Sequence, residues 1–388
     1  MWKFVPLAAF AVSALCLSAA ARGEGQFLAR NGTDLILRGK PLRLVSVNKY
    51  DLFSRYLKGG EDRAQALASL EEAARRGFTA IRFNGGGFWP VDMKDWHRQD
   101  FYRGAFDALV ADCKRLGIGL IPTVNWNTYL FPDMAGECAL DMLLNPDSRS
   151  WQYVELYARQ LVGRYRDNDT ILFWELSNEL NLGADLGPMR PFGWSDMNWR
   201  DLGAPFMRLR RDNYTTDQMN VYAHRLASVI HEVDKNHLIS TGYSAPRPAA
   251  QHMRRQKGQM DWTADTFDEL VTYLRDTHAD PIDLISIHFY SEHDNMRFGN
   301  KDPLSSKALN QLKQAADRVG KPVYIGETGD NYAERPEAPF LRDVLDTARG
   351  LNIPLTLVWN WDTPGDKFSV SPTTTPRVVE MMEQANKR

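Results

Sequence analysis

Short apolar runs alternate with longer mixed segments along most of the chain. The runs are rich in Val, Ile and Leu and span residues 41–48, 78–84, 118–126, 171–179, 237–243, 282–290, 321–329 and 353–362. Runs of this length and composition are typical of strands buried in a parallel sheet. The segments between them carry helix start and stop signals and predict helices at 61–76, 100–116, 148–166, 215–234, 264–275, 303–319, 336–349 and 376–387.

This alternation determines the expected fold class. Eight strands, each followed by a helix, form the pattern that closes a (β/α)8 TIM barrel. Ahead of the barrel, residues 27–39 predict a β-hairpin with its turn at Asn31-Gly32. Two long loop insertions, 181–213 and 244–263, follow strand ends. We therefore expect a single α/β domain over residues 22–388 that is a TIM barrel with an N-terminal β-hairpin.

Composition and charge narrow the range of partners. The 388 residues carry a formal net charge of −2, with 43% hydrophobic and 25% charged residues, which is ordinary for a soluble globular protein. Nucleic acid is not an expected partner, because phosphate binding leaves a basic footprint. The 11 Trp residues suggest that some aromatic rings line a ligand groove while others pack in the core.

The first 21 residues have the pattern of a signal peptide. A lysine at position 3 precedes an apolar stretch of about 14 residues, which is shorter than the roughly 20 that span a bilayer. Small residues follow and predict cleavage near Ala20 or Ala21. A lipoprotein signal would use Cys16, but the bulky Leu15 stands where such signals carry a small residue. We expect a secreted or periplasmic mature chain that is monomeric and not bound to a membrane.

The cysteines of the mature chain leave two states open. Cys113 and Cys138 either form a disulfide, which an oxidising compartment permits, or remain as two buried thiols. The chain contains no CxxC or HxH pattern, so the sequence predicts neither a metal site nor a cofactor.

Polar and aromatic side chains gather at the predicted strand ends. In a TIM barrel the carboxyl ends of all strands share one mouth, where active sites lie. A single Asn at such an end is usually a turn residue and a single Trp usually belongs to the core, but the whole set predicts a functional site. Its members are Asn48, Arg82, Asn125, Trp126, Asn178, Glu179, Tyr243, His288, Tyr290, Glu327, Trp359 and Trp361.

Two of these residues are glutamates on strands that lie across the barrel from one another. Two carboxyls about 5–5.5 Å apart are the arrangement that hydrolyses a glycosidic bond with retention. One must carry a proton and the other a charge, so we expect Arg82 to keep Glu327 ionised. Tyr290 is expected to donate a hydrogen bond to Glu327, and Asn178 to contact a sugar hydroxyl. His288 is expected to orient the acid/base or bind a hydroxyl, and Trp359 to form a stacking floor for one sugar ring.

The segments WELSNE, IRF, SIHFY, YIGETG and LVWNW occur in this order on the expected strands. Together they resemble glycoside hydrolase family 5, a family of retaining TIM-barrel glycosidases. The resemblance covers essentially the whole mature chain. It implies that Asn178-Glu179 supplies the acid/base and Glu327 the nucleophile, with Arg82, His288, Tyr290 and a strand-eight Trp in support, for which Trp359 is preferred over Trp361.

One departure from the family pattern bears on the subfamily. Many family members carry a His at the end of strand three, whereas PTVNWNTY places Asn125 or Trp126 there. With its Trp-rich mouth the chain is more similar to the mannanase branch than to typical cellulases. The expected substrate is therefore a β-linked polysaccharide or oligosaccharide, with β-1,4-mannan ahead of β-1,4-glucan. Whether the enzyme cuts inside a chain or from its end stays open.

Alternatives remain for the whole site. A non-catalytic sugar-binding barrel would keep the Trp floor and tolerate loss of either glutamate. A metal-dependent hydrolase needs His ligands at early strand ends, which instead offer Asn48, Arg82 and Asn125.

The other charged residues near the predicted mouth are not expected to be catalytic. Glu175 lies inside its strand, where we expect a hydrogen-bonded structural carboxylate. The remaining loop charges are expected to be hydroxyl binders or solvated groups, although the basic ones could instead meet an acidic substrate group. These are Glu292, Asp294, Asp362, Arg208, Arg210, Arg211, Arg254 and Arg255.

Overall fold

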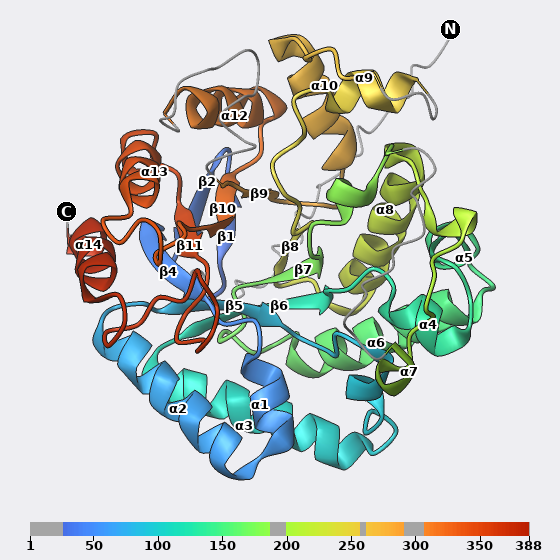
Figure 1. Ribbon diagram of the computed structural model, residues 1–388, viewed down its shortest axis with the longest axis horizontal. Coiled ribbons are helices and arrows are strands. Elements are labelled where there is room, and N and C mark those ends of the chain that lie inside the picture. The colour runs from blue at the N-terminus through green and yellow to red at the C-terminus, as the bar shows by residue number, and fades with distance from the viewer. Residues whose placement is uncertain (1–25, 187–198, 257–260, 291–305, 388) are drawn as a thin grey trace, which may run out of the picture.

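The structure is a computed structural model that describes residues 26–186, 199–256, 261–290 and 306–387 (Figure 1). The expected signal peptide lies outside the described residues, as do Glu292, Asp294 and parts of both insertions. Within the described ranges, no helix combines the length and apolar composition that crossing a membrane requires.

The barrel wall is a parallel sheet that closes on itself. In the described residues eight strands follow the order β8-β7-β6-β5-β4-β11-β10-β9, and a parallel bridge between Ser240 and Leu284 joins the two ends. The sheet therefore confirms the predicted (β/α)8 barrel. Its strands are β4 (Leu44–Asn48), β5 (Ala80–Asn84), β6 (Gly119–Asn125), β7 (Phe173–Ser177), β8 (Leu238–Ser240), β9 (Ile285–His288), β10 (Val323–Thr328) and β11 (Leu355–Val358).

Long helices surround the strands, as Figure 1 shows. One example of how the sequence sets their ends is α8, where Thr215 accepts a hydrogen bond from the N–H of Gln218 and the Gln218 side chain accepts one in return. All the long helices lie in segments where the sequence predicts them. They are α2 (Gly60–Arg75), α3 (Gln99–Leu116), α6 (Arg149–Tyr165), α8 (Thr216–Val233), α10 (Phe267–Thr277), α12 (Ser306–Val319), α13 (Pro339–Gly350) and α14 (Pro376–Lys387).

The N-terminal hairpin forms as predicted and gains a third short strand. Strands β1 (Ala29–Asn31), β2 (Asp34–Leu37) and β3 (Lys40–Pro41) make an antiparallel sheet, with the turn at Gly32 in the left-handed region at φ 61°. Leu28, Leu35 and Leu42 pack with apolar residues of the barrel strands. The hairpin is therefore held by burial of its apolar side chains against the barrel.

Several short helices lie in segments where the sequence predicts none. They are α1 (Leu52–Lys58), α4 (Leu130–Ala135), α5 (Ala139–Leu144), α7 (Trp199–Leu202) and α9 (Ala250–Arg255), with 3-10 turns η1 (Pro90–Met93), η2 (Leu180–Gly183) and η3 (Arg210–Asp212). Helices this short are marginal alone and depend on tertiary contacts.

One such contact corrects a prediction about the first insertion. The guanidinium of Arg208 lies 2.5 Å from the Asp133 carboxylate and 4.0 Å from the centre of the Tyr129 ring, and its side chain is 11% exposed. Arg208 is therefore not a solvated loop charge, because it joins the insertion to α4. Three other arginines of the two insertions also form ion pairs: Arg211 with Asp141, Arg254 with Asp217 and Asp276, and Arg255 with Glu269.

The two cysteines of the described residues do not form a disulfide. Cys113 is buried in α3, Cys138 is partly buried beside α5, and both are free thiols. Burial raises the pKa of the Cys113 thiol well above its usual range, so this sulfur is an unreactive core group.

Candidate active site

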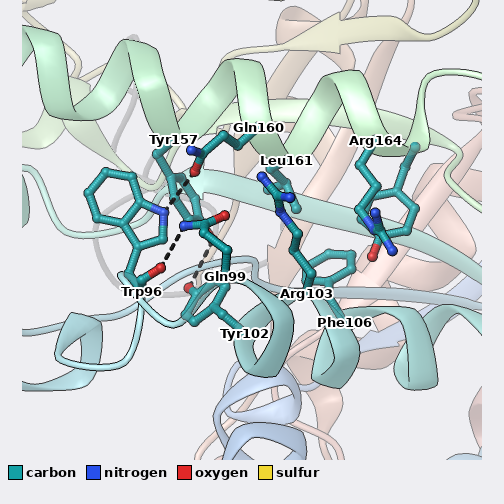
Figure 2. A pocket seen from close by; sticks show the side chains of 10 residues that line it. Trp96, Gln99, Tyr102, Arg103, Phe106, Tyr157, Gln160, Leu161 and Arg164 are labelled. Carbon is teal, nitrogen blue, oxygen red and sulfur yellow. Dashed lines mark hydrogen bonds between the residues drawn. The ribbon is translucent and has the colours of Figure 1, made fainter.

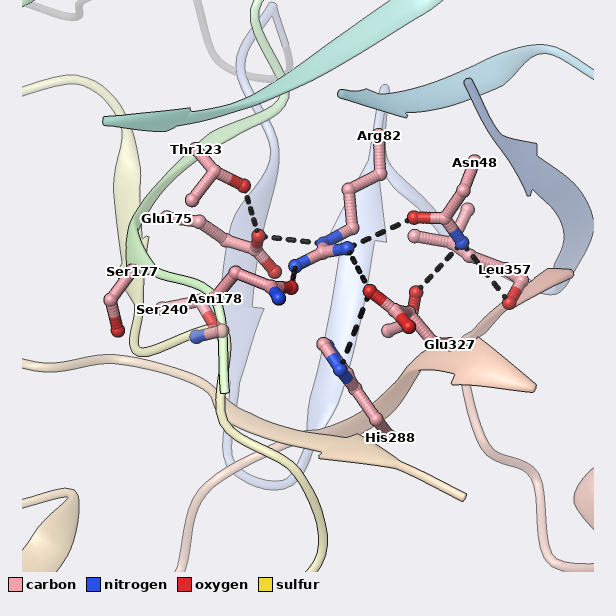
Figure 3. A network of polar contacts seen from close by, with 12 residues as sticks. Asn48, Arg82, Thr123, Glu175, Ser177, Asn178, Ser240, His288, Glu327 and Leu357 are labelled. Carbon is pink, nitrogen blue, oxygen red and sulfur yellow. Dashed lines mark hydrogen bonds and ion pairs between the residues drawn. The ribbon is translucent and has the colours of Figure 1, made fainter. Parts of the chain in front are cut away.

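Arg82 lies at the centre of the barrel mouth, with a fully buried side chain that β5 directs inward. Its Nε donates to Glu175 at 2.7 Å, its Nη1 to Asn48 at 3.0 Å and Glu327 at 2.7 Å, and its Nη2 to Asn178 at 2.8 Å (Figure 3). Burial opposes the charge of the guanidinium, but Glu175 and Glu327 outweigh it and raise the pKa of Arg82. One permanent cation thus fixes side chains from the ends of three other strands.

Glu175 is the carboxylate partner of Arg82 that lies below the barrel mouth, inside β7. It is fully buried and accepts hydrogen bonds from Arg82 Nε, from Thr123 Oγ1 at 2.7 Å and from the Tyr324 hydroxyl. The Tyr324 hydroxyl lies 2.8 Å from Ser240 Oγ. Glu175 therefore has the hydrogen-bonded structural surroundings that its position inside the strand predicts.

Glu179 follows β7 in a backbone conformation that is rare for residues with a side chain. Its φ of 51° and ψ of 27° lie in the left-handed region, and its N–H donates to the carbonyl of Gly242 at 2.8 Å. A Cβ at Gly242 would come within 1.8 Å of the Ser177 carbonyl oxygen, so only glycine permits this approach. Strained backbone of this kind gathers at functional sites. It leaves the Glu179 side chain 29% exposed at the mouth.

Glu327 reaches the same mouth from β10. One carboxylate oxygen accepts from Arg82 at 2.7 Å, the other accepts from the Tyr290 hydroxyl at 3.0 Å, and the side chain is 7% exposed. His288 Nδ1 lies 3.1 Å from Glu179 Oε1 and 3.5 Å from Glu327 Oε1. One oxygen of each carboxylate and one His288 nitrogen lie within 4.8 Å of one another. The two glutamates thus converge across one space, as the sequence predicts.

The electrostatics of the two carboxyls differ from the simplest expectation. Burial raises the pKa of Glu327, and the charges of His288 and Arg82 oppose that rise without cancelling it. Burial also disfavours the charge of Glu179, but the His288 hydrogen bond and charge outweigh it and lower the pKa of Glu179. Arg82 therefore acts on Glu327 in the predicted direction and burial outweighs it. His288 thus contacts two carboxyls whose pKa values are shifted in opposite directions.

Both carboxylates open into a cavity of about 540 Å³, within the range of small-ligand sites. Several of its residues lie in the loops after β10 and β11 and are not predicted from the sequence. A strand-end position was the available signal for Gly329 and Asp330, but the others follow no periodic pattern. The lining consists of Glu179, Tyr290, Glu327, Gly329, Asp330, Asn331, Glu334, Arg335, Trp359, Lys367 and Phe368.

A second hollow lies between the outer helices α3 and α6 (Figure 2). Its volume is about 20 Å³, which is roughly the space of one water molecule. The Tyr102 and Tyr157 hydroxyls beside it lie 3.0 Å apart and bond to each other. This hollow is a packing gap and not a substrate site.

Aromatic residues form one side of the mouth. Trp359 lines the cavity, and the Tyr50 ring stacks beside it at 5.6 Å with an interplanar angle of 21°. Trp126 lies 6.0 Å from Trp359, is 6% exposed and covers the Arg82 guanidinium at 4.5 Å. Trp359 thus occupies the predicted floor, while Trp126 supports Arg82 by a cation–π contact.

Some predicted residues face away from the cavity. Trp361 is fully buried, donates from Nε1 to the Ser69 carbonyl of α2 at 3.0 Å and packs edge-on against Phe78. The prediction of Trp361 as a site residue is therefore wrong, because its indole belongs to the helix layer. Asn125 is also buried, and its amide donates to the Tyr222 hydroxyl of α8 at 2.9 Å.

Two further strand-end residues have structural contacts. Asn48 donates to the Gly326 carbonyl at 3.0 Å while it accepts from Arg82, so it links β4 to β10. Tyr243 is 1% exposed and packs edge-on against His278, which places it outside the cavity lining.

Comparisons with known proteins identify the family of this chain. The sequence model of the cellulase family, glycosyl hydrolase family 5, matches residues 40–365. Two mannan endo-1,4-beta-mannosidases of Oryza sativa subsp. japonica are similar: number 8 is 24% identical over 77% of this chain and 78% of that protein, and number 2 is 23% identical over 96% and 86%. The crystal structure of the endo-1,4-beta-mannanase from Rhizomucor miehei has a TM-score of 0.63 at 18% identity, over 93% of this chain and 100% of that chain. The family match covers nearly all of the barrel, so this chain belongs to glycoside hydrolase family 5 and is a glycoside hydrolase.

Proposed function

We propose that the protein hydrolyses β-1,4-mannan with retention of configuration, and that β-1,4-glucan is its next substrate. The observation that carries the proposal is the convergence of Glu179 and Glu327 on one His288 nitrogen at the cavity. The mannan preference is supported by the names of the similar mannosidases. Export as a monomer after removal of residues 1–21 is part of the same proposal.

In the first step Glu179 gives its proton to the glycosidic oxygen while a Glu327 oxygen attacks the anomeric carbon. The bond to the leaving sugar breaks, and a glycosyl ester with Glu327 forms. In the second step ionised Glu179 takes a proton from water, the water oxygen attacks the anomeric carbon, and the ester bond breaks. Two inversions give net retention, and both carboxyls return to their starting states.

The spacing of the carboxyls lets Glu179 change roles between the steps. Like charges this close raise one another's pKa, so ionised Glu327 helps Glu179 to hold a proton. Ester formation removes the charge of Glu327, and Glu179 becomes a stronger acid whose carboxylate then serves as base. In the free site His288 lowers the pKa of Glu179, and exclusion of water by a bound glycan acts in the opposite direction.

A non-catalytic sugar-binding barrel is the alternative that experiment must separate from this proposal. Such a protein needs the Trp359 floor but not the acid chemistry of two carboxyls. The ion pair of Arg82 with Glu327 at 2.7 Å and the Tyr290 hydroxyl at 3.0 Å favour the enzyme, because sugar binding alone requires neither contact.

The test is Glu327→Gly with azide as a substitute nucleophile. We expect hydrolysis of mannan and aryl mannosides to fall by several orders of magnitude, and azide to restore turnover with the aryl substrate. Because azide attacks from the side vacated by Glu327, the product is the α-glycosyl azide. Glu337→Gly is the matched control, since Glu337 pairs with Arg377 and is 64% exposed. A wild-type rate in Glu327→Gly would exclude the proposal.

Substrate preference needs a separate measurement. The mature chain would be incubated with mannan, glucomannan, carboxymethylcellulose and xylan, and the products separated by size. Mannan and glucomannan should be cut fastest. A distribution of intermediate lengths indicates internal cleavage, whereas mannose or mannobiose alone indicates cleavage from chain ends. Faster cleavage of carboxymethylcellulose than of mannan would replace mannan with glucan as the substrate.

A further inference from the structure

The catalytic carboxylates and the histidine between them also have the arrangement of a transition-metal site. His288 Nδ1 lies 3.1 Å from Glu179 Oε1 and 3.5 Å from Glu327 Oε1, and one possible ligand atom from each of the three residues lies within 4.8 Å of the other two. Figure 3 shows the His288 ring directed at the Glu327 carboxylate. One imidazole and two carboxylates are a ligand set that zinc accepts.

The separations fit one ion held by three ligands. Zinc lies about 2.0–2.2 Å from imidazole nitrogen and carboxylate oxygen, so neighbouring ligand atoms of a tetrahedral site are about 3.3–3.6 Å apart. The two distances to His288 Nδ1, 3.1 and 3.5 Å, are close to this range. The Glu179 side chain is 29% exposed, so its carboxylate has room to adjust its position toward an ion. Glu179 and Glu327 both line the cavity, through which an ion can reach their carboxylates.

The charges of the site favour a cation. Glu175 and Glu327 pair with the single guanidinium of Arg82, and Glu179 lies beside His288. Once Glu179 has lost the proton that catalysis uses, the network has two negative charges in excess when His288 is neutral. Arg82 occupies one lone pair of Glu327 Oε1, and a carboxylate oxygen has a second. Repulsion from Arg82 weakens binding relative to a dedicated metal centre, which is consistent with an inhibitory ion and not with a resident cofactor.

We propose that Glu179, Glu327 and His288 Nδ1 bind Zn²⁺ or a similar transition-metal ion, which competes with the glycan. With the ion bound, the Glu327 lone pair that attacks the anomeric carbon and the Glu179 lone pair that carries the proton are both occupied by the metal. The imidazole ligand selects Zn²⁺, Co²⁺, Ni²⁺ and Cu²⁺ over Mg²⁺ and Ca²⁺, which prefer oxygen.

A second cluster in the described residues also combines one imidazole with two carboxylates and serves as a control. His252, Asp265 and Glu269 also bring possible ligand atoms within 4.8 Å. Asp265, however, accepts from the N–H groups of Gln251 and His252 and lies 2.8 Å from His252 Nδ1. Glu269 caps the start of α10 and pairs with Arg255. Its carboxylates are engaged in helix capping and ion pairing, and we expect no binding there.

The first test measures binding without using activity. Co²⁺ in a tetrahedral site absorbs visible light strongly, whereas hydrated octahedral Co²⁺ absorbs weakly. Titration of the mature chain with Co²⁺ should give a saturable visible band that Zn²⁺ removes and Mg²⁺ does not. Glu179→Gln should weaken Co²⁺ binding at least tenfold, and His252→Phe should leave it unchanged. The thermal midpoint of each variant without metal shows that it is folded.

The second test measures competition. Zn²⁺ should raise KM for soluble mannan without changing kcat, chelation by EDTA should restore the rate, and equal Mg²⁺ should change the rate less than twofold. A Co²⁺ band that persists in Glu179→Gln, a band lost in His252→Phe, or Zn²⁺ inhibition that lowers kcat alone would each overturn the proposal. The Co²⁺ titration keeps its meaning even if mannan is not the substrate.

Discussion

Arg82 separates two layers of the barrel interior that use the same residue types differently. In the layer below the mouth, Glu175 is fully buried and accepts from Arg82, Thr123 and Tyr324. At the mouth, Glu179 and Glu327 open into the cavity and lie 3.1 and 3.5 Å from Nδ1 of one shared histidine. The chemical role of a carboxylate here depends on its donors and its access to the cavity, because Glu175 and Glu179 belong to the same six-residue segment WELSNE.

The lower layer supplies rigidity that the upper layer uses. A buried carboxylate with full hydrogen bonding holds Arg82 in one orientation, and Arg82 in turn orients Glu327 and Asn178. Catalysis needs groups that are already oriented before the charge develops. If this division is correct, substitutions in the lower layer act first on stability and substitutions at the mouth act first on rate.

After Glu327, the largest effect is expected at Glu179. Glu179→Ala should lower kcat/KM for mannan by about 10²- to 10⁴-fold, because the leaving oxygen no longer receives a proton. Aryl mannosides with acidic phenols should lose less, since their leaving groups need no proton. Added azide should give the β-glycosyl azide, which forms from the glycosyl ester and is the opposite anomer to the product of Glu327→Gly. An equal loss with mannan and with acidic aryl substrates would contradict the acid/base role.

Glu175→Gln should act on stability first. The substitution removes the carboxylate that pairs with Arg82 in the lower layer. Breaking a buried ion pair costs about 3–5 kcal/mol of unfolding free energy. Urea denaturation measures this loss. Glu179→Gln is the matched control, because its side chain is 29% exposed and should change stability by less than Glu175→Gln does. Equal losses in the two variants would remove the distinction between the layers.

The two layers also contain a matched pair of tyrosines. Tyr290 donates to Glu327 at the mouth, and Tyr324 donates to Glu175 below it. Tyr290→Phe should lower kcat/KM about 10- to 100-fold, since hydrogen bonds to charged groups contribute about 1.5–3 kcal/mol. Tyr324→Phe should lower the free energy of unfolding by a similar amount. Steady-state kinetics and urea denaturation of both variants measure the two effects.

The pH profile separates these tyrosines further. Burial raises the pKa of Glu327, and the Tyr290 hydrogen bond opposes that rise because it favours the ionised carboxylate. Losing the bond raises the pKa further, so the acidic limb of kcat/KM in Tyr290→Phe should move to higher pH. The acidic limb of Tyr324→Phe should stay in place. A shift to lower pH in Tyr290→Phe would mean that this limb does not report Glu327.

The sequence predicts the barrel and the place of the candidate site for physical reasons. Strands buried on both faces must be continuously apolar, so their ends and the side chains there can be read directly. The two glutamates, Arg82 and the Trp359 floor follow from that reading and from the family resemblance. The short helix α4 does not, because its contacts with Arg208 come from a distant insertion.

Two other features, the orientations of the Trp side chains after β11 and the positions of the cavity loops, depend on tertiary contacts. Trp359 and Trp361 both lie at the end of β11, and only the fold shows that one indole lines the cavity while the other reaches Ser69 of α2. The cavity loops after β10 and β11 contribute Asn331 and Lys367, whose positions depend on contacts such as the hydrogen bond from the Tyr332 N–H to the Lys367 carbonyl. Irregular loops have no period from which such contacts can be derived.

The smallest expected effect gives the strictest test of the separation between layers. Thr123→Val removes one donor to Glu175 with little change of shape, while Arg82 and Tyr324 continue to donate. We expect a loss of about 1 kcal/mol in unfolding free energy, with kcat/KM within twofold of wild type. Urea denaturation and steady-state kinetics on the same preparation measure both quantities. If kcat/KM instead falls tenfold while stability hardly changes, Glu175 acts through Arg82 on the charge of Glu327, and the lower layer is part of the catalytic machinery.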